Sequence, residues 1–398
     1  MYSLLILFWI CLGLIFYTYI GYGLLLMVLL KMKRLFSSSE KKQPDKVYTP
    51  TVTLLVAAYN EELDIEQKIK NSLALEYPED KLQLLFITDG SNDRTPEIVA
   101  KHPGVQLLHQ PERKGKIAAV ARAMPLVTSE ITIYTDANTM LNKEAIQKIV
   151  RHYQRPEVGA VAGEKQVVSP EQDAAAGAGE GFYWKYESTL KRWDSELHTV
   201  VGAAGELFSI RTSLFEHVPA DTLIEDFYMT LRIAQRGYRV VYEPEARAVE
   251  PPSADSREEL KRKVRIAAGG IQAIVRLKAL LNPFRYGMLS FQYISHRVLR
   301  WTLAPLALLI LLFCNIGLAL QGLFLYQLLL AGQLLFYACA LAGYWLESRK
   351  LKVKVFFIPY YFFLMNYAVY AGFFRYLRGR QSVLWERAKR QASDSETA

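Results

Sequence analysis

The sequence predicts an α/β domain with a mixed, mostly parallel sheet, joined to apolar helices long enough to cross a membrane. The middle of the 398-residue chain alternates short apolar runs with stretches of helical spacing. Long uncharged apolar runs occupy both ends, and 51% of all residues are hydrophobic against 22% charged. Strands that alternate with helices are typical of a parallel sheet covered on both faces. A composition this apolar excludes a disordered chain.

Three runs without Asp, Glu, Lys or Arg predict membrane helices: residues 1–30, 302–346 and 355–374. A span needs roughly 20 apolar residues, so the first run predicts one helix and the second predicts two, with a turn between Asn315 and Gly322. The third run either crosses the membrane or re-enters it. A cleaved signal peptide is the alternative for the first run, which lacks a basic start and a small-residue cleavage site.

The net charge of +9 follows largely from basic residues beside these runs. Lys31, Lys33 and Arg34 come directly after the first run, and further basic residues precede the third. Lys and Arg gather on the cytoplasmic side of membrane spans. We therefore expect an integral protein of the plasma or inner membrane whose central domain is cytoplasmic. No nucleic-acid-binding pattern is visible, and the three cysteines suggest neither disulfides nor zinc.

The predicted elements follow in order from the linker onward. Residues 31–50 are basic and polar, as in a linker, and residues 51–254 form the α/β domain. Apolar, β-rich runs predict strands, and amphipathic spacing predicts helices between them. The strands are expected at 51–58, 82–88, 105–108 and 131–135, and the helices at 61–75, 94–101 and 116–124. Residues 255–301 predict amphipathic interface helices, and residues 375–398 a basic polar tail.

Polar residues follow three of the predicted strands, in the sequences A-Y-N-E-E (58–62), D-G-S-N-D (89–93) and D-A-N (136–138). The carboxyl ends of parallel strands meet at one edge of a sheet, where ligands bind. A single Asp after a strand is commonly a helix cap. Three such segments at one edge indicate a binding site instead. No glycine-rich dinucleotide or P-loop motif is present.

These segments resemble the motifs of family 2 glycosyltransferases, which have the GT-A fold. The first two resemble the opening of that family, and Tyr134–Asn138 falls at its D-x-D motif. Ile224–Asp226 falls where membrane polysaccharide synthases have T-E-D. The similarity covers about residues 50–300 and extends to cellulose, hyaluronan, chitin-oligosaccharide and poly-N-acetylglucosamine synthases. It implies a Rossmann-like GT-A domain that transfers sugar from a UDP-sugar.

The resemblance also implies which residues bind the nucleotide. They are Ala58, Tyr59, Glu61, Asp89, Lys116, Asp136 and Arg265. Lys116 resembles the lysine of the family's G-K pair, although a lysine at a helix start is the plainer interpretation. The Asn that usually follows this pair in the family is Ala121 here.

The same resemblance implies a metal site and a base. Asp136 and Asn138 are expected to share Mg²⁺ or Mn²⁺, ions that prefer oxygen ligands. Asn supplies less charge than Asp, so we expect weaker metal binding. Asp226 is the expected general base, with a helix-capping role as its alternative. A single displacement that uses one base inverts the configuration at the anomeric carbon.

Acceptor contacts are expected from Glu225, Gly205, Trp184 and Arg262. Arg265 matches the Arg of the Q-x-x-R-W motif, whereas Arg262 stands at its Gln and Ile266 at its Trp. These two differences put processive synthesis in doubt. The alternative for this segment is a basic amphipathic helix lying on anionic lipid. Aromatic residues such as Trp184 are more often core residues than sugar platforms.

The sequence therefore predicts a membrane-bound, metal-dependent, inverting glycosyltransferase. It would use a cytosolic UDP-sugar to build or extend a cell-surface polysaccharide or exopolysaccharide. The alternative acceptor is a lipid, such as polyprenyl phosphate or a ceramide-like lipid, which receives one sugar. A non-catalytic membrane scaffold is a third reading. Export through so few helices would require a second copy of the chain, as a homo-oligomer, or a partner protein.

Overall fold

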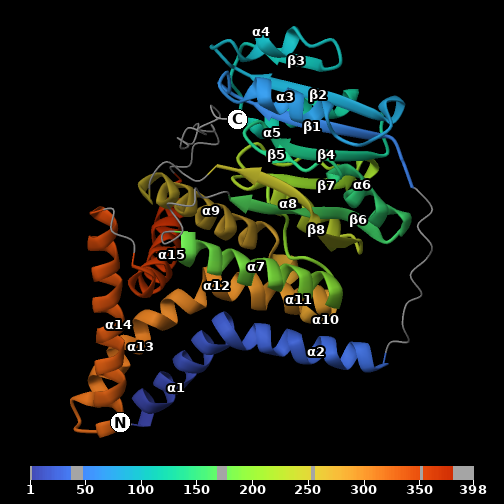
Figure 1. The fold of residues 1–398 in the computed structure, drawn as a ribbon. Helices are drawn as coiled ribbons and strands as arrows, with labels where there is room; N and C mark the ends of the chain where they lie inside the picture. Colours follow the sequence, from blue (N-terminus) through green and yellow to red (C-terminus); the bar gives the residue numbers. More distant parts are fainter. Residues whose placement is uncertain (1, 37–47, 168–176, 252–255, 350–352, 380–398) are drawn as a thin grey trace. The chain divides into compact units, whose positions relative to one another are not determined.

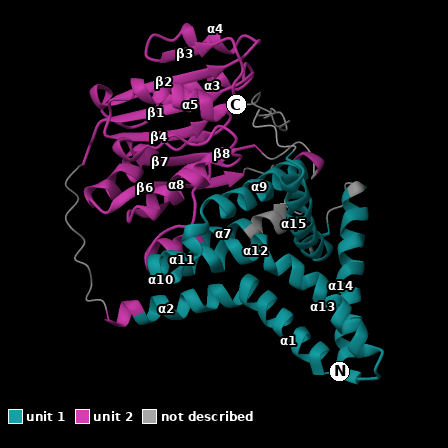
Figure 2. Cartoon of the chain, turned by 180° about the vertical axis from the view of Figure 1, so that it is seen from behind, with its two compact units in different colours: residues 1–32, 169–190, 259–379 teal, residues 33–168, 191–258, 380–398 magenta. Residues whose placement is uncertain are grey.

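The computed structural model describes residues 2–36, 48–167, 177–251, 256–349 and 353–379. The chain divides into two compact units (Figure 2). A helical unit comprises residues 1–32, 169–190 and 259–379, and a sheet unit comprises residues 33–168, 191–258 and 380–398. Most of the predicted linker, at residues 37–47, and the predicted tail beyond residue 379 lie outside the described residues.

The sheet unit is built on one mixed, mostly parallel sheet of eight strands in the order β3-β2-β1-β4-β7-β6-β8-β5 (Figure 1). The strands are β1 (Val52–Ala58), β2 (Leu82–Asp89), β3 (Gln106–Gln110), β4 (Ile131–Asp136), β5 (Met140–Leu141), β6 (Val158–Val167), β7 (Leu207–Arg211) and β8 (Arg239–Glu250). The helices of this unit are α3 (Ile65–Leu73), α4 (Thr95–Ala100), α5 (Lys116–Ala123), α6 (Ala145–Val150), α8 (Glu225–Gln235) and the end of α7 (Gly177–Leu197).

The first four strands pair in parallel, as the sequence predicts. β1 lies between β2 and β4, with Ala58 opposite Thr88 and Ala57 opposite Asp136. This register brings the carboxyl ends of β1, β2 and β4 to the same edge of the sheet. All seven residues of β1 are buried, because a central parallel strand is covered on both faces.

The predicted helix at 61–75 is shorter in the structure, where α3 covers Ile65–Leu73. Its first residues form a turn instead. The N–H of Glu61 donates to Thr95 Oγ1 at 2.8 Å, and the Glu61 carbonyl accepts from the N–H of Asp64 and of Ile65. The link to Thr95 ties the segment after β1 to the segment after β2.

The far half of the sheet is antiparallel in part. β7 pairs antiparallel with both β4 and β6, and β5 pairs antiparallel with β8, whereas β6 and β8 run parallel. Asp136 at the end of β4 therefore lies where the sheet changes from parallel to antiparallel pairing. The strands of this half lie outside the four strands expected from the sequence.

The helical unit begins with one long helix, α1 (Tyr2–Phe16) and α2 (Tyr22–Phe36), joined by a π-helical turn. Figure 1 shows the helix changing direction between them. The later helices are part of α7, α9 (Ser256–Arg276), α10 (Pro283–Tyr286), α11 (Met288–Tyr293), α12 (Leu299–Trp301), α13 (Leu303–Ala319), α14 (Phe324–Ser348) and α15 (Lys354–Leu377).

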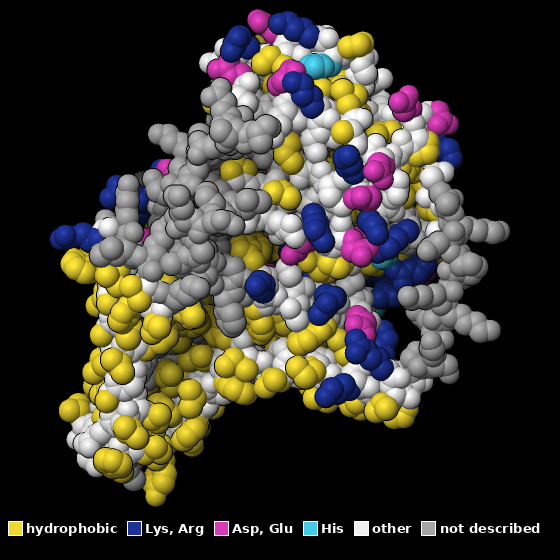
Figure 3. Space-filling model, viewed as in Figure 1, with side chains coloured by type: hydrophobic (Ala, Val, Ile, Leu, Met, Phe, Trp, Pro, Cys, Tyr) yellow, Lys and Arg dark blue, Asp and Glu magenta, His cyan; other side chains and the backbone are white. Residues whose placement is uncertain are grey.

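Three helices of the described residues are long and apolar enough to span a membrane. They are Tyr2–Phe36, Phe324–Glu347 and Val355–Leu377, with mean hydropathies of 2.2, 1.7 and 1.3. A bent pair, Met288–Trp301 and Leu303–Ala319, passes the same test with a 51° bend. Hydrophobic side chains gather on the surface over α1, α13 and α14 (Figure 3). Exposed apolar surface of this kind is typical of contact with lipid.

A buried ion cluster lies inside the helical unit, next to the bend. The carboxylate of Glu187 on α7 forms ion pairs with Arg297 at 2.6 Å and with Arg300 at 2.9 Å. The side chain of Glu187 is 3% exposed. A buried charge is tolerated when it is paired in this way.

Candidate active site

Asp89, the last residue of β2, uses only one of its two carboxylate oxygens in hydrogen bonds within the described residues. Its Oδ2 accepts the N–H of Lys114 at 3.0 Å and the N–H of Gly115 at 2.6 Å. Its Oδ1 is buried and has no hydrogen-bond partner among the described residues. Leaving a buried acceptor unpaired costs free energy. Asp89 is therefore prepared to accept one hydrogen bond from a ligand.

Gly90 allows the 113–115 loop to approach Asp89 closely. Its φ is +70°, and a Cβ at this position would lie 2.7 Å from the Cα of Arg113. The guanidinium of Arg113 in turn stacks on the ring of Tyr59, 3.8 Å from its centroid. Tyr59 follows β1 and Arg113 belongs to the loop whose N–H groups bind Asp89, so this stack lies at the same edge of the sheet as Asp89.

The first turn after β1 is held by polar contacts to the segment after β2. Asn60 has a φ of 52° and donates its backbone N–H to Ser91 Oγ at 3.1 Å. Its amide also exchanges hydrogen bonds with Asn92. Ala58, which precedes this turn, is buried at the end of β1. Two of the three polar segments predicted from the sequence thus form one connected loop layer.

Lys116 brings the third segment and α8 together. Its Nζ lies 2.7 Å from Asp136 Oδ1 and 3.0 Å from Glu225 Oε1. All three side chains are mostly buried, with exposed fractions of 16%, 21% and 14%. Burial disfavours the charge of Lys116, but the carboxylates of Asp136 and Glu225 outweigh it and raise the pKa of the ammonium group. Lys116 is therefore a fixed cation in the pocket.

Asp226 follows Glu225 in the first turn of α8. Burial, together with the charge of Glu225, raises the pKa of Asp226 to about 7. A Cβ on Gly205 would lie 3.4 Å from Asp226 Oδ2 and 3.6 Å from Lys116 Nζ. Gly205 thus leaves space directly in front of both groups. A carboxylate with a pKa near neutrality is well matched to general-base chemistry.

A buried triad of ion-paired side chains, not expected from the sequence, also belongs to the sheet unit. Lys165 of β6, whose side chain is 2% exposed, pairs with both Glu206 and Glu250. The negative charge of Glu206 adds to the rise in the pKa of Asp226 and of Asp136, for which burial is the larger cause. The triad thus contributes to the electrostatics of the site without offering a motif in the sequence.

The oxygen ligands that the protein offers at this edge fit a divalent cation only when phosphate oxygens complete its coordination. Asp136 and the half-buried Asn138 offer oxygen ligands at the end of β4. The described residues contain no group of three or more His, Cys, Asp or Glu side chains arranged to hold an ion. Mg²⁺ commonly binds one or two carboxylates together with substrate phosphates. The arrangement fits such a shared site.

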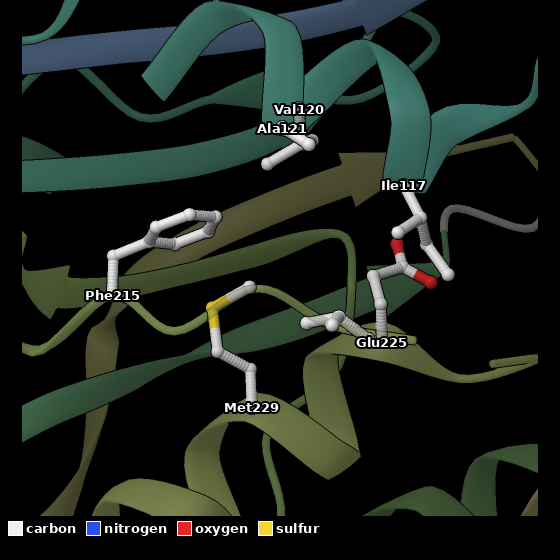
Figure 4. Close-up of a pocket in the computed structure, with 7 residues that line it drawn as sticks. Ile117, Val120, Ala121, Phe215, Glu225 and Met229 are labelled. Carbon is white, nitrogen blue, oxygen red and sulfur yellow. The ribbon is translucent and has the colours of Figure 1, made fainter. Parts of the chain in front are cut away.

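A small apolar hollow adjoins the cluster on the Glu225 side. It lies between α5 and α8 (Figure 4). Apart from the carboxylate of Glu225, its walls are apolar: Ile117, Val120, Ala121, Phe215, Val218 and Met229. One side of the Glu225 carboxylate therefore faces an apolar surrounding.

Three of the predicted site residues belong to the helical unit. Trp184 lies on α7, with Lys263 Nζ 5.1 Å from its ring centroid. Arg262 on α9 forms an ion pair with Glu259 at 3.0 Å, and Arg265 on the same helix is half-buried. Their expected roles toward donor and acceptor stay predictions.

The sheet unit matches a known family. Residues 53–218 match the family model described as Glycosyl transferase family 2. The match covers 166 of the 398 residues, and this stretch is similar to family 2 glycosyltransferases. This confirms the resemblance given above, and with it the prediction of a glycosyltransferase.

Two curated relatives of this domain are named for different products. The chain is 34% identical over 167 residues to β-monoglucosyldiacylglycerol synthase of Nostoc sp., across 40% of this chain and 34% of that protein. It is 27% identical over 240 residues to poly-β-1,6-N-acetyl-D-glucosamine synthase of Staphylococcus aureus, across 56% of each chain. The chain thus spans about a third of the first relative and just over half of the second.

A solved structure resembles nearly the whole chain. It is the mannosyltransferase PcManGT from Pyrobaculum calidifontis in complex with GDP-Man and Mn²⁺. The likeness has a TM-score of 0.69 at 25% identity and covers 94% of this chain and 100% of that one. The predicted fold class, a GT-A domain with helical segments of membrane-span length, is confirmed.

Proposed function

We propose that this chain is a membrane-bound, inverting glycosyltransferase that takes its sugar from a UDP-sugar. The observation that carries the proposal is the contact of Lys116 with Asp136 and Glu225, beside Asp226, at the carboxyl ends of the central strands. A cation, hard oxygen ligands and a carboxylate of near-neutral pKa are the groups that such a transfer needs.

The reaction can be written with the residues of the pocket. Asp226 accepts the proton of an acceptor hydroxyl, and the resulting oxygen nucleophile attacks the anomeric carbon. The bond from that carbon to the diphosphate oxygen breaks, and its electron pair leaves with the nucleoside diphosphate. Lys116 offsets the negative charge that develops there. A Mg²⁺ or Mn²⁺ ion held by Asp136 and Asn138 would supply further charge neutralisation when bound.

Asp89 favours uracil as the base. One of its oxygens is occupied by two backbone N–H groups, so a single oxygen remains. Uracil offers one N–H on its pairing edge. Guanine offers two adjacent donors, which pair best with both oxygens of a carboxylate. We expect UDP to bind at least tenfold more tightly than GDP in calorimetry, and Asp89→Asn to weaken UDP binding. Equal affinity for UDP and GDP would count against this assignment.

The helical unit supports placement in a membrane. Three described helices have the length and composition of spans, and the last turn of α2 carries Lys33 and Arg34. By the positive-inside rule, this end of the helix and the sheet unit that follows it are cytoplasmic. The donor would then be drawn from the cytosol.

The expected acceptor is a growing cell-surface polysaccharide. A lipid acceptor is the second candidate, favoured because Arg262 and Ile266 stand where polysaccharide synthases have the Gln and Trp of Q-x-x-R-W. Purified protein incubated with a panel of UDP-sugars and Mn²⁺ or Mg²⁺ tests both. Nucleotide release with a ladder of products supports the polysaccharide, and one added sugar on a lipid supports the second candidate. Release from none of the donors contradicts the proposed function.

A further inference from the structure

Lys68 is a buried lysine that the proposed mechanism does not use. It lies on α3 and is 0% exposed. Helix α3 buries Ile65, Ile69 and Ser72 on the same side. An ammonium group in such a position loses its hydration, at a considerable cost in free energy. Burial accordingly lowers the pKa of Lys68 to about 7, and the charge of Asp136 opposes this shift.

Both protein contacts of the ammonium group lie on the turn that carries Asp136. Lys68 Nζ donates to the carbonyl oxygen of Thr139 at 2.6 Å and to Thr135 Oγ1 at 3.1 Å. Thr135 and Thr139 are the residues on either side of the D-A-N segment, residues 136–138. One side chain from α3 therefore holds the two ends of this segment together.

Further hydrogen bonds close the turn. Thr139 Oγ1 donates to the carbonyl oxygen of Asp136 at 2.8 Å and shares a bond of 3.1 Å with Thr135 Oγ1. The side chain of Asp136 binds Lys116 instead. No ion pair joins Lys68 to Asp136 among the described residues. Lys68 thus influences Asp136 by holding the neighbouring residues Thr135 and Thr139, and by electrostatic interaction without direct contact.

We propose that Lys68 is a positioning residue, which fixes the turn at residues 135–139 so that Asp136 and Asn138 present their oxygens to the donor diphosphate and its metal ion. Methionine has nearly the same volume and would fill this site without the desolvation cost. The polar end of Lys68 therefore has a use beyond packing, and its two hydrogen bonds place that use at the D-A-N turn. The effect on metal and donor binding rests on the proposed function, whereas the effect on the backbone of residues 135–139 does not.

The test compares Lys68→Met with Lys70→Met. Lys70 lies on the same helix but has a side chain that is 70% exposed, so it is a matched control. Calorimetry or Mn²⁺ electron paramagnetic resonance measures the affinity for Mn²⁺ and UDP together. Hydrogen exchange of the nucleotide-free full-length protein measures the turn itself. Loss of a residue that orients a metal ligand typically weakens metal binding by about 10–100-fold.

We expect Lys68→Met to weaken Mn²⁺–UDP binding at least tenfold and to speed amide exchange within residues 136–139, with exchange elsewhere and the melting temperature close to wild type. Lys68→Gln, which keeps a donor for Thr139, should recover part of both losses. Wild-type affinity and wild-type exchange in Lys68→Met would overturn the inference.

Two further outcomes are also decisive. If Lys68→Met does not fold, Thr135→Val removes one partner of the ammonium group, and unchanged local exchange in that variant overturns the inference. If the wild-type protein binds no UDP, the proposed function fails. Faster exchange confined to the turn in Lys68→Met would still support the positioning role.

Discussion

Replacement of Asp226 by Asn gives the sharpest test of the proposed chemistry. The change removes the proton acceptor and keeps the size of the side chain. General-base catalysis contributes about 10²–10⁴-fold to a rate, so we expect transfer to fall by that factor while UDP still binds. Asp80→Asn, on an exposed turn, is the matched control and should leave transfer unchanged.

The pH dependence follows from the pKa of Asp226, which burial and the charge of Glu225 raise to about 7. The base works only when it is ionised. At pH 6, one unit below that pKa, about one-tenth of the molecules carry the ionised form. We therefore expect transfer to rise about tenfold from pH 6 to pH 8, measured as UDP release at saturating donor.

The same shift affects stability in the opposite direction. A carboxyl whose folded-state pKa lies above its unfolded value stabilises the fold at low pH, and this stabilisation is lost as the pH rises from about 4 to about 7. The full shift corresponds to at most about 4 kcal/mol. Asp226→Asn should therefore melt at a higher temperature than wild type at pH 8. A flat pH–rate profile between 6 and 8, or near-normal transfer by the variant, would refute the reasoning.

Four other perturbations test separate parts of the structure. Lys116→Met removes the cation between two carboxylates, so we expect calorimetry to show that UDP binding in the presence of Mn²⁺ is weakened at least tenfold. In the wild-type protein, we expect EDTA to abolish transfer until Mn²⁺ or Mg²⁺ is restored. Glu187→Ala leaves Arg297 and Arg300 buried without their carboxylate, which should destabilise the fold by about 3–5 kcal/mol in thermal or denaturant unfolding; an unchanged unfolding curve would contradict this. Gly90→Ala forces a side chain against the backbone of Arg113 at a φ of +70° and should weaken nucleotide binding more than it changes the melting temperature.

The parallel half of the sheet was predictable because its signals are local. The strands predicted at 82–88 and 131–135 each end one residue later in the structure, at Asp89 and Asp136. Their apolar runs are continuous because both faces are covered. The helix predicted at 61–75 was too long. The hydrogen bond from Glu61 to Thr95 holds the residues before α3 in a turn, and it joins residues that are far apart in the sequence.

The antiparallel half and the supporting charges were not predictable in this way. β6 pairs with β8 about eighty residues further along the chain, and no local pattern reports such pairing. Lys165 and Lys68 are single lysines in otherwise ordinary segments. Their partners, Glu206 and Glu250 for one and Thr135 and Thr139 for the other, become neighbours only in the folded chain.

The strand pairing changes from parallel to antiparallel at β4, and the candidate site residues come from two stretches of chain on either side of this change. Apart from Arg265 on α9, the groups assigned to the nucleotide and its metal ion run from Ala58 to Asn138 and belong to the parallel half. The proposed general base Asp226 and the groups assigned to the acceptor, Trp184, Gly205, Glu225 and Arg262, all follow it in the sequence. A chimera of two related enzymes with its crossover between β5 and β6 would therefore inherit its choice of activated sugar from one parent and its choice of recipient from the other.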